Sequence, residues 1–243
     1  MTVSDVQVHI GGAETLERPW PPGGAALAHR PTPLGKDELL REMDAAGVDR
    51  AIIVSPSWEG ERNDLALEAA LLHPDRFAVM GRLAFEQSES RSLVDTWECQ
   101  PGMLSMRLTF HRGADRTWLT DGTADWFWAA AEHAGIAVMV FAPGLLPRIA
   151  DVAARHQDLC LVLDQLALSS DIKDTALGPA LRPALALAQY PHVTVKATAL
   201  PSYVTEAYLY PSLHAHIRRV VEVYGPHRVF WGTDLTRLRG SYR

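Results

Sequence analysis

Short apolar runs rich in Val, Ile, Leu and Phe alternate along the chain with stretches in which apolar residues recur every three or four positions. The first pattern is typical of buried strands, and the second is typical of helices that pack one face against a sheet. The predicted strands are Val3–His9, Ala51–Ser55, Phe77–Leu83, Met103–Leu108, Ile136–Phe141, Leu159–Leu163, Val193–Ala197 and Val229–Gly232. The predicted helices are Lys36–Ala46, Arg62–His73, Glu89–Glu98, Ala124–Ala134, Leu146–His156, Ala180–Ala188 and Ser212–Tyr224. This regular alternation predicts an α/β fold of the parallel (β/α)8 type, a TIM-like barrel.

The length of the chain agrees with this fold, because 243 residues lie close to the roughly 250 that such a barrel needs. We therefore expect a single domain over residues 1–243. Only nine residues follow Asp234, and at about 1.5 Å per residue they are too few for a covering helix. We expect the eighth helix to be missing, so that the chain is either a truncated form or is covered at this apolar seam by another subunit.

Composition and charge indicate whether the protein binds membranes, nucleic acids or small molecules. Hydrophobic residues make up 47% of the chain, and no apolar stretch approaches the roughly 18 residues that a membrane-spanning helix needs. Asp5, Gln7 and His9 interrupt the N-terminus where an export signal requires an apolar run, so we expect a cytoplasmic protein that does not bind membranes. A net charge of -6 without a basic cluster argues against nucleic-acid binding and favours a small-molecule substrate.

The two cysteines, Cys99 and Cys160, are too few for a disulfide framework. Both lie in apolar or amphipathic segments of a chain without an export signal. We therefore expect them to be buried, reduced thiols.

The predicted topology sorts the ten histidines. Five lie in turns that lead from a helix into a strand, at the face of a barrel where residues serve stability: His73, His133, His156, His192 and His227. His214 and His216 lie near the start of a predicted helix and fit exposed helix positions. Of the remaining His9, His29 and His111, only His9 is held on a strand.

Polar side chains gather at the carboxyl ends of the predicted strands, where the loops of a barrel converge on substrate. The candidates are Gln7, His9, Trp58, Arg82, Arg107, Asp164, Gln165, Lys196 and Asp234. Asp5, Gln7 and His9 alternate along the first strand and therefore point to the same side of it. Polar groups at every second position are costly in a dry core, so this pattern indicates a site.

Four stretches together carry a resemblance to a known family: Asp5–His9, Leu40–Arg50, Leu163–Leu166 and Phe230–Asp234. In their order and spacing they resemble the amidohydrolase-related family over nearly the whole chain. The similarity is closest to the branch that contains sugar-acid lactonases and 2-pyrone-4,6-dicarboxylate lactonase, and aromatic-acid decarboxylases are further off. The resemblance implies a barrel enzyme that hydrolyses a lactone or a similar ester or amide of a small carboxylated substrate.

The departures from the family pattern concern metal ligands. The first motif of the family is Asp-x-His-x-His, but Gln7 stands at its first histidine and only His9 keeps the second. The Asp-His pair common after the sixth strand is here Asp164-Gln165. Catalytic zinc normally has three protein ligands, and glutamine amides bind it weakly. We expect no cofactor; a divalent metal such as zinc is the alternative, with His9, Asp234 and Gln7 as its ligands.

The resemblance also implies how hydrolysis proceeds without a metal, since the pyrone-dicarboxylate lactonases activate water with the aspartate after the eighth strand. Here Asp234 would be the general base, and His9 with the amides of Gln7 and Gln165 would polarise the carbonyl. The side chains expected to bind the anionic substrate or wall its pocket are Arg82, Arg107, Lys196 and Trp58. The alternatives are a structural ion pair for Arg107 and an ion pair with Asp164 for Lys196.

Other interpretations stay open beside a metal-independent hydrolase. One is a decarboxylase of an aromatic or related acid, and another is a non-catalytic remnant that only binds a small acid. The loss of two imidazoles favours the remnant, whereas retention of Asp234 speaks against it, because an isolated carboxylate is destabilising unless it is used or paired. A homo-oligomer also stays open. The first loop, Gly11–Gly35, lacks a helical period and is a candidate lid or pocket wall.

Overall fold

The structure is a computed structural model that describes residues 1–85, 87, 89–111, 113–238 and 242. Its strands are β1 (Ser4–Val8), β2 (Arg50–Val54), β3 (Phe77–Gly81), β4 (Met103–Thr109), β5 (Val138–Phe141), β6 (Leu161–Leu163), β7 (Val193–Thr198) and β8 (Val229–Gly232). They follow one another in the sheet in chain order, and neighbouring strands run parallel, as β2 and β3 do with Ala51 opposite Phe77. All eight predicted strands are present, with ends within two residues of those expected.

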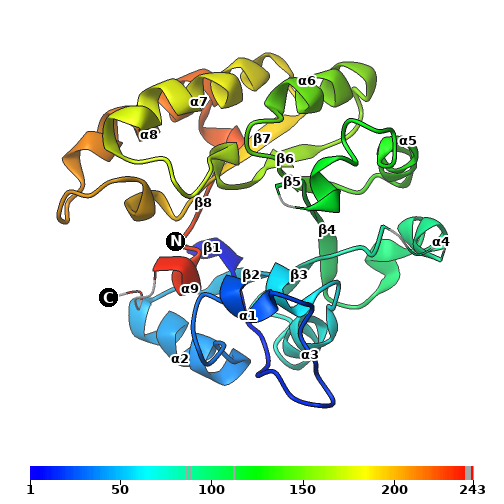
Figure 1. The fold of residues 1–243 in the computed structure, drawn as a ribbon. Helices are drawn as coiled ribbons and strands as arrows, with labels where there is room; N and C mark the ends of the chain where they lie inside the picture. Colours follow the sequence, from blue (N-terminus) through cyan, green and yellow to red (C-terminus); the bar gives the residue numbers. More distant parts are fainter. Residues whose placement is uncertain (86, 88, 112, 239–241, 243) are drawn as a thin grey trace. The chain divides into compact units, whose positions relative to one another are not determined.

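Helices alternate with the strands, as the apolar periodicity predicts (Figure 1). They are α1 (Gly24–Leu27), α2 (Lys36–Ala46), α3 (Asp64–Leu72), α4 (Ser90–Val94), α5 (Asp125–Ala134), α6 (Leu146–Arg155), α7 (Leu177–Ala186), α8 (Pro211–Tyr224) and α9 (Leu235–Leu238). Short 3₁₀ helices lie between them at Ser57–Glu59, Trp97–Cys99, Ala114–Arg116, Asp164–Ala167, Asp174–Ala176, Leu187–Gln189, Leu200–Tyr203 and Pro226–Arg228. The fold class is α/β of the TIM-like (β/α)8 type, which confirms the prediction from the sequence.

The chain divides into two compact units. The first comprises Met1–Ala84, Thr96–Met106 and Trp231–Arg243, and the second comprises Phe85–Asp95 and Arg107–Phe230. The boundaries at 106/107 and 230/231 fall inside β4 and β8, so these two strands contribute residues to both units. The expectation of a single domain stays a prediction.

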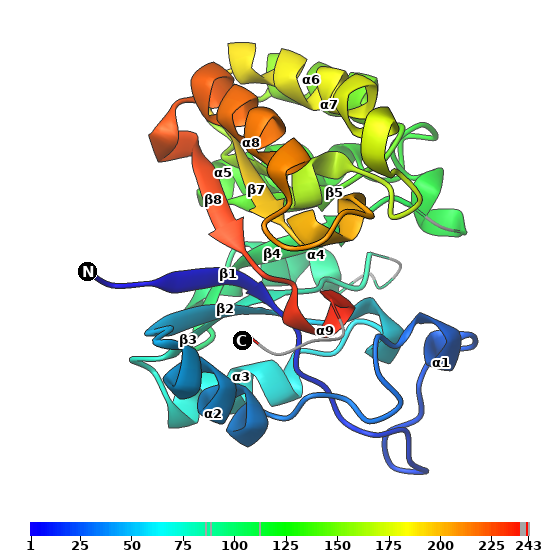
Figure 2. The same cartoon turned by 90° about the vertical axis from the view of Figure 1, so that its left-hand side faces the viewer.

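The first unit is built on β1, β2 and β3, with α2 and α3 packed against one side of them (Figure 2). The amphipathic helix α2 buries Leu39 and Met43 and ends at Gly47, whose φ of 70° is in the left-handed region that favours glycine. Helix α3 turns three small side chains, Ala66, Ala69 and Ala70, toward the interior, which allows it to lie close to β3.

The first loop belongs to this unit and is held at several points. It contains the one-turn helix α1, which contacts the 3₁₀ helix Ser57–Glu59. Arg18 donates to the buried Glu59 at 2.7 Å, and the same carboxylate accepts the backbone N–H of Gly12 at 2.5 Å. Burial raises the pKa of Glu59, and these two hydrogen bonds partly offset the rise. The loop is therefore packed onto the unit by a partly buried ion pair.

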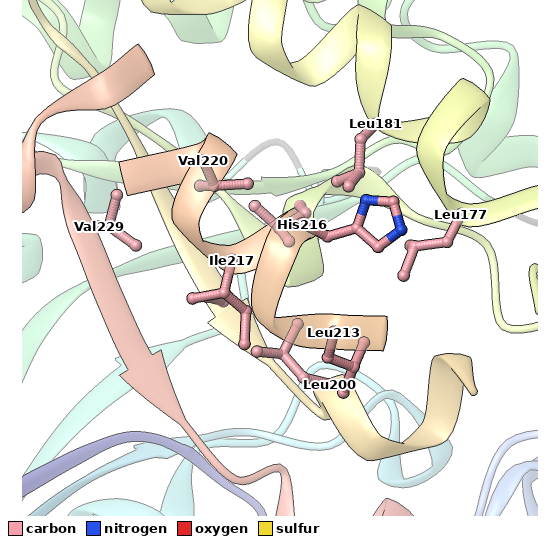
Figure 3. Close-up of a pocket in the computed structure, with 10 residues that line it drawn as sticks. Leu177, Leu181, Leu200, Leu213, His216, Ile217, Val220 and Val229 are labelled. Carbon is pink, nitrogen blue, oxygen red and sulfur yellow. The ribbon is translucent and has the colours of Figure 1, made fainter. Parts of the chain in front are cut away.

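The second unit packs α6, α7 and α8 side by side over β5, β6 and β7 (Figure 1). Helix α6 buries Ile149, Val152 and Ala153 on one stripe, as its strong amphipathic pattern predicts. Between α7 and α8 lies a cavity of about 10 Å³ whose lining is apolar except for His216 (Figure 3). A void of this size is at the lower limit for one water molecule, so we interpret it as imperfect packing and not as a substrate pocket.

Two expectations about the chain outside the core can now be compared with the structure. Among the described residues after β8, the one helix is the four-residue α9, and Phe230 and Trp231 on β8 are 39% and 47% exposed. Cys99 and Cys160 are free thiols, but both are exposed, so the expectation that they are buried is wrong. Both stand at the ends of elements, Cys99 closing a 3₁₀ helix and Cys160 preceding β6, where the apolar pattern no longer implies burial. Among the described residues, none of the helices is long and apolar enough to cross a membrane.

Candidate active site

Three polar side chains of the first unit are buried, two on β1 and one at the residue directly after it. Asp5, Gln7 and His9 have relative exposures of 0%, 0% and 3%. Buried polar side chains are costly unless they are hydrogen-bonded, so the partners of these three residues determine what the site can do.

His9 and Asp234 form the central pair. The Nδ1 atom of His9 lies 2.7 Å from the carbonyl oxygen of Val54, and its Nε2 atom lies 3.4 Å from Oδ1 of Asp234. A carbonyl oxygen only accepts hydrogen bonds, so Nδ1 carries a proton in every charge state of the ring. Nε2 is thus the nitrogen that can gain or lose a proton, and it faces the carboxylate of Asp234. A proton on Nε2 makes this arrangement favourable. The pair can accept or release a proton beside a strand end.

The backbone fixes the position of Asp234. Its φ of 50° lies in the left-handed region, which is strained for a residue other than glycine, and its N–H donates to the carbonyl of Gln7 at 2.8 Å. The preceding residue, Thr233, donates both its N–H (3.0 Å) and its hydroxyl to the carboxylate of Asp5. Hydrogen bonds at Thr233 and at Asp234 itself therefore fix the backbone that carries the carboxylate.

Asp5 is the anchor of this segment. Besides Thr233 it accepts the N–H of Gln7 at 2.9 Å and the hydroxyl of Tyr242 at 2.9 Å. Burial raises the pKa of Asp5, and these four hydrogen bonds partly offset the rise. Burial and the nearby carboxylate also raise the pKa of the Tyr242 phenol, which keeps it a hydrogen-bond donor at neutral pH.

Gly232 allows β8 to lie this close to β1. A Cβ at this position would stand 2.9 Å from Oδ1 of Asp5 and 2.9 Å from both Cβ and N of Gln7. Real Cβ atoms essentially never come so close to other heavy atoms. The Gly-Thr-Asp sequence after β8 therefore combines the residue that permits the approach, the residue that binds Asp5 and the residue that carries the carboxylate.

Three rings meet next to this pair. The centroid of the His9 ring is 5.6 Å from that of His29 and 5.7 Å from that of Trp58, and those of His29 and Trp58 are 5.0 Å apart. Nδ1 of His29 also lies 2.9 Å from the hydroxyl oxygen of Thr236. Trp58 is 5% exposed, and its Nε1 has no hydrogen-bond partner among the described residues. The sequence predicts Trp58 at the site but does not predict His29, because His29 lies on a loop and not on a strand.

Arg82, expected to bind substrate, is engaged within the first unit. Its Nε and Nη2 atoms each lie 2.9 Å from a carboxylate oxygen of Glu61, and its backbone exchanges two hydrogen bonds with the side chain of Asn63. Glu61 and Asn63 are not predicted by the sequence, because nothing in their local pattern marks a partner about twenty residues away.

Arg107, in the second unit, forms an ion pair with Asp164. Nε and Nη2 of Arg107 lie 2.9 Å and 2.7 Å from Oδ2 of Asp164, and the two side chains are 7% and 0% exposed. This is the structural ion pair named above as the alternative for Arg107. The sequence leaves Lys196 open as the cationic partner of Asp164, whereas in the structure Arg107 forms that ion pair. Lys196 is itself buried on β7 at 2% exposure.

Strained backbone conformations occur directly after two strands of the second unit. After β6, three consecutive residues, Gln165, Leu166 and Ala167, have φ values of 51°, 53° and 54°, and Ala199 after β7 has a φ of 52°. Such backbone persists only where the surroundings enforce it, and it is often found at functional sites. Gln165 is 5% exposed, so its amide is buried at one of these ends. Its expected role in binding substrate stays a prediction.

Comparison with known proteins places the chain in a family. The amidohydrolase family profile matches residues 5–237. The chain belongs to the amidohydrolase family. The match covers the strand-end residues from Asp5 to Asp234, which confirms the resemblance inferred from the motifs. No curated protein matches the chain.

Solved structures of other amidohydrolases share the fold. An amidohydrolase from Burkholderia multivorans with bound zinc is 22% identical, with a TM-score of 0.80 over 100% of this chain and 88% of that one. A probable 2-pyrone-4,6-dicarboxylic acid hydrolase from Acinetobacter baumannii with bound citric acid is 16% identical, with a TM-score of 0.71 over 98% and 85%. A 5-carboxyvanillate decarboxylase from Sphingomonas paucimobilis is 18% identical, with a TM-score of 0.62 over 96% and 88%. At these identities the likeness shows the fold alone.

Because one of these proteins binds zinc, the donor set of this amidohydrolase must be tested against that metal. His9 and Asp234 supply two donors, and the third position of the strand motif holds the amide of Gln7. Among the described residues, no three His, Cys, Asp or Glu side chains come together in a way that could hold a metal ion. Catalytic zinc normally takes three such ligands, so the residues do not fit it, and we derive no step through a metal.

Proposed function

We propose that this amidohydrolase hydrolyses a lactone, or a similar ester or amide, of a small carboxylated substrate, with Asp234 activating the water. The observation that carries the proposal is the His9–Asp234 pair, in which a buried carboxylate at a strand end faces an imidazole nitrogen at 3.4 Å. The hydrogen bond from Nδ1 of His9 to Val54 orients the ring so that the other nitrogen meets Asp234. A base oriented by a second group in this way is typical of enzymes that activate water or a nucleophile.

In the proposed reaction the carboxylate of Asp234 takes a proton from water as the water oxygen attacks the substrate carbonyl carbon. His9, protonated on both nitrogens, donates from Nε2 and stabilises negative charge near Asp234 and on the carbonyl oxygen. Burial of both groups strengthens these interactions, because little water competes for them. The hydrogen bonds from Asp234 to Gln7 and from Thr233 to Asp5 hold the Asp234 carboxylate in one position, which favours a near-attack geometry.

The choice of a carboxylated lactone rests on the family branch. The Acinetobacter baumannii protein of the same fold is a probable hydrolase of a pyrone dicarboxylic acid, and its structure contains citric acid. Both compounds carry carboxylates. In this chain Arg82, Arg107 and Lys196 remain the cations proposed for an anionic substrate, although Arg82 and Arg107 already engage Glu61 and Asp164.

The test is a turnover screen with pyrone and sugar-acid lactones and mono-esters of dicarboxylic acids, followed by Asp234→Asn on any substrate found. We expect the variant to keep the fold and the affinity for substrate but to lose about 10²-fold or more in kcat, the lower range for removal of a general base. Release of CO₂ from carboxylated aromatic acids, without hydrolysis, would identify a decarboxylase. Binding without turnover would identify a non-catalytic protein. Either result contradicts the proposal.

Removal of metal gives a second test. Because the donor set does not fit catalytic zinc, we expect the purified protein to contain less than one zinc per chain and to keep its activity after dialysis against a chelator. Elemental analysis before and after dialysis, with the rate measured on the same samples, provides the check. One tightly bound metal per chain, with activity that disappears and returns with it, would show that the metal-independent mechanism is wrong.

A further inference from the structure

We propose that His29, on the first loop, is a further catalytic residue that gives a proton to the alkoxide oxygen leaving the substrate. This inference rests on the proposed hydrolysis by Asp234 and extends it to the second half of the reaction. It arises from the ring cluster of His9, His29 and Trp58 in the first unit.

Each ring nitrogen of His9 already faces a group of the protein. Nδ1 donates to the carbonyl of Val54, and Nε2 faces Asp234. The proton that passes from water to Asp234 enters this pair and is held there. An ester or lactone with a poor leaving group needs a proton at a different oxygen when the carbon–oxygen bond breaks.

His29 is suited to that task because its partner tolerates both charge states of the ring. Nδ1 lies 2.9 Å from Oγ1 of Thr236, and a hydroxyl can either donate or accept a hydrogen bond. The ring can therefore release and regain a proton without losing this contact. His9 differs, since Nδ1 keeps its proton on the carbonyl of Val54 and Nε2, the nitrogen that can exchange a proton, faces Asp234.

The position of His29 agrees with the role. Its ring touches those of His9 and Trp58, and Thr236 is two residues beyond Asp234, so the imidazole is attached to the segment that carries the base. His29 is partly exposed, whereas His9 is 3% exposed, so a proton lost from His29 can be replaced from solvent. Trp58 adds a buried N–H that has no partner among the described residues, a donor that an oxygen of the substrate would satisfy.

The proposed step balances as follows. The water oxygen forms a bond to the carbonyl carbon while one water proton moves to Asp234. The tetrahedral intermediate then breaks its bond to the alkoxy oxygen, and the proton on His29 moves to that oxygen. Solvent reprotonates His29, and Asp234 releases its proton to solvent, so the net reaction converts an ester and water into an acid and an alcohol.

The experiment varies the leaving group. Mono-4-nitrophenyl, monophenyl and monoethyl glutarate are hydrolysed by the wild type and by His29→Gln, with His214→Gln, an exposed histidine on α8, as the matched control. We expect His29→Gln to lose about 10²-fold in kcat on the ethyl ester, the lower range for loss of a general acid, and less than about threefold on the nitrophenyl ester, whose leaving group needs no proton. His214→Gln should match the wild type on all three.

A second measurement separates proton transfer from a structural role. In His29→Gly, imidazole added to the buffer should raise the rate on the ethyl ester in proportion to its concentration and leave the rate on the nitrophenyl ester unchanged. Thr236→Val, which removes the hydrogen bond but keeps the ring, should lower the rate on the ethyl ester by a smaller factor than His29→Gln does and change the rate on the nitrophenyl ester little. Equal losses on all three esters in His29→Gln, or no rescue by imidazole, would overturn the role of His29.

Failure of this inference is distinguishable from failure of the proposed function. Asp234→Asn acts before the leaving group departs, so it should slow all three esters. If it does so while His29→Gln does not discriminate among them, the hydrolase stands and the role of His29 is wrong. If the wild type hydrolyses none of the esters or lactones, or Asp234→Asn retains the rate, both are wrong.

Discussion

At the scale of single residues, one buried carboxylate organises the backbone that presents another. Oδ1 of Asp5 accepts two backbone N–H groups, those of Gln7 and Thr233, and Oδ2 accepts two hydroxyls, those of Thr233 and Tyr242. The two oxygens therefore differ in what they require. An N–H can only donate, so Oδ1 must remain an acceptor, whereas the hydroxyls facing Oδ2 can also accept a hydrogen bond.

This difference predicts that Asp5→Asn is tolerated far better than Asp5→Ala. Asparagine can place its oxygen on the two N–H groups and its NH₂ group toward the two hydroxyls. Alanine leaves two buried N–H groups without an acceptor, at about 1–3 kcal/mol each, and we expect a loss of about 2–6 kcal/mol in the free energy of unfolding. Urea titration of the three chains gives the comparison. Equal stability of the two variants would show that Asp5 is not the anchor described.

The pH dependence of stability follows from the same residue. Because burial raises the pKa of Asp5, the folded chain binds this proton more tightly than the unfolded chain does. Its contribution to stability is then fully present below the ordinary pKa of 3.8 and is lost as the pH rises through the folded-state pKa. The difference in unfolding free energy between the wild type and Asp5→Asn should fall between pH 4 and pH 7. A difference that rises over this range contradicts the direction of the shift.

The ion pair of Arg107 and Asp164 gives a further prediction at this scale. Removing one partner strands a buried charge, which typically costs about 3–5 kcal/mol, whereas replacing both with apolar side chains is often close to neutral. We therefore expect Arg107→Met and Asp164→Leu each to destabilise the chain more than the two changes together. A double-mutant cycle measured by urea unfolding tests this coupling. Additive losses would mean that the two side chains do not stabilise each other.

At the scale of elements, periodicity made most of the fold predictable. Helix α2 has the bounds predicted for Lys36–Ala46, and β8 has those predicted for Val229–Gly232, because each has a clear apolar period and ends at turn residues. The left-handed run at Gln165–Ala167 had no such signal. Three non-glycine residues in this conformation are imposed by tertiary packing, which local sequence preferences do not record.

Packing of β8 against β1 predicts the effect of a single methyl group. Gly232→Ala should place a Cβ 2.9 Å from Asp5 and Gln7, and overpacking of this kind typically costs about 1–3 kcal/mol. Gly35→Ala is the matched control, since Gly35 has an ordinary φ of -90° and no atom within 4 Å of the added Cβ. We expect the control to change the stability by less than about 1 kcal/mol, because the smaller entropy of the unfolded chain and the weaker N-cap of α2 offset each other. Thermal unfolding of both variants provides the measurement, and equal effects would show that the close approach is absent.

At the scale of the whole molecule, the sequence identified which residues stand at strand ends but not which of them meet. His29 and Thr236 are 207 residues apart, and Arg107 and Asp164 are 57 residues apart. No local pattern encodes such pairs, so the sequence leaves Arg107 open both as a substrate-binding cation and as a member of a structural ion pair. His9 and Asp234, which the family resemblance implies at one site, do meet, because the N–H of Asp234 donates to the carbonyl of Gln7 on β1.

The last prediction concerns cooperativity. The chain passes between its two compact units four times, at 84/85, 95/96, 106/107 and 230/231. Within β4, residues Met103–Met106 pair with β3 in the first unit, while Phe110, just beyond the strand, donates to Phe141 in the second. Neither unit is a continuous piece of chain, so unfolding of one removes strand residues that anchor the other, and we expect a single transition.

Seven tryptophans report on this directly. Trp20, Trp58, Trp97 and Trp231 belong to the first unit, and Trp118, Trp126 and Trp128 belong to the second. After incorporation of 5-fluorotryptophan, each resonance follows its own residue through a urea titration by ¹⁹F NMR. Coincident midpoints and slopes for both groups are the expected result, because agreement between independent probes is the criterion for two-state unfolding. If the two groups lose their native signals at separate urea concentrations, the units unfold independently and the chain is not one cooperative domain.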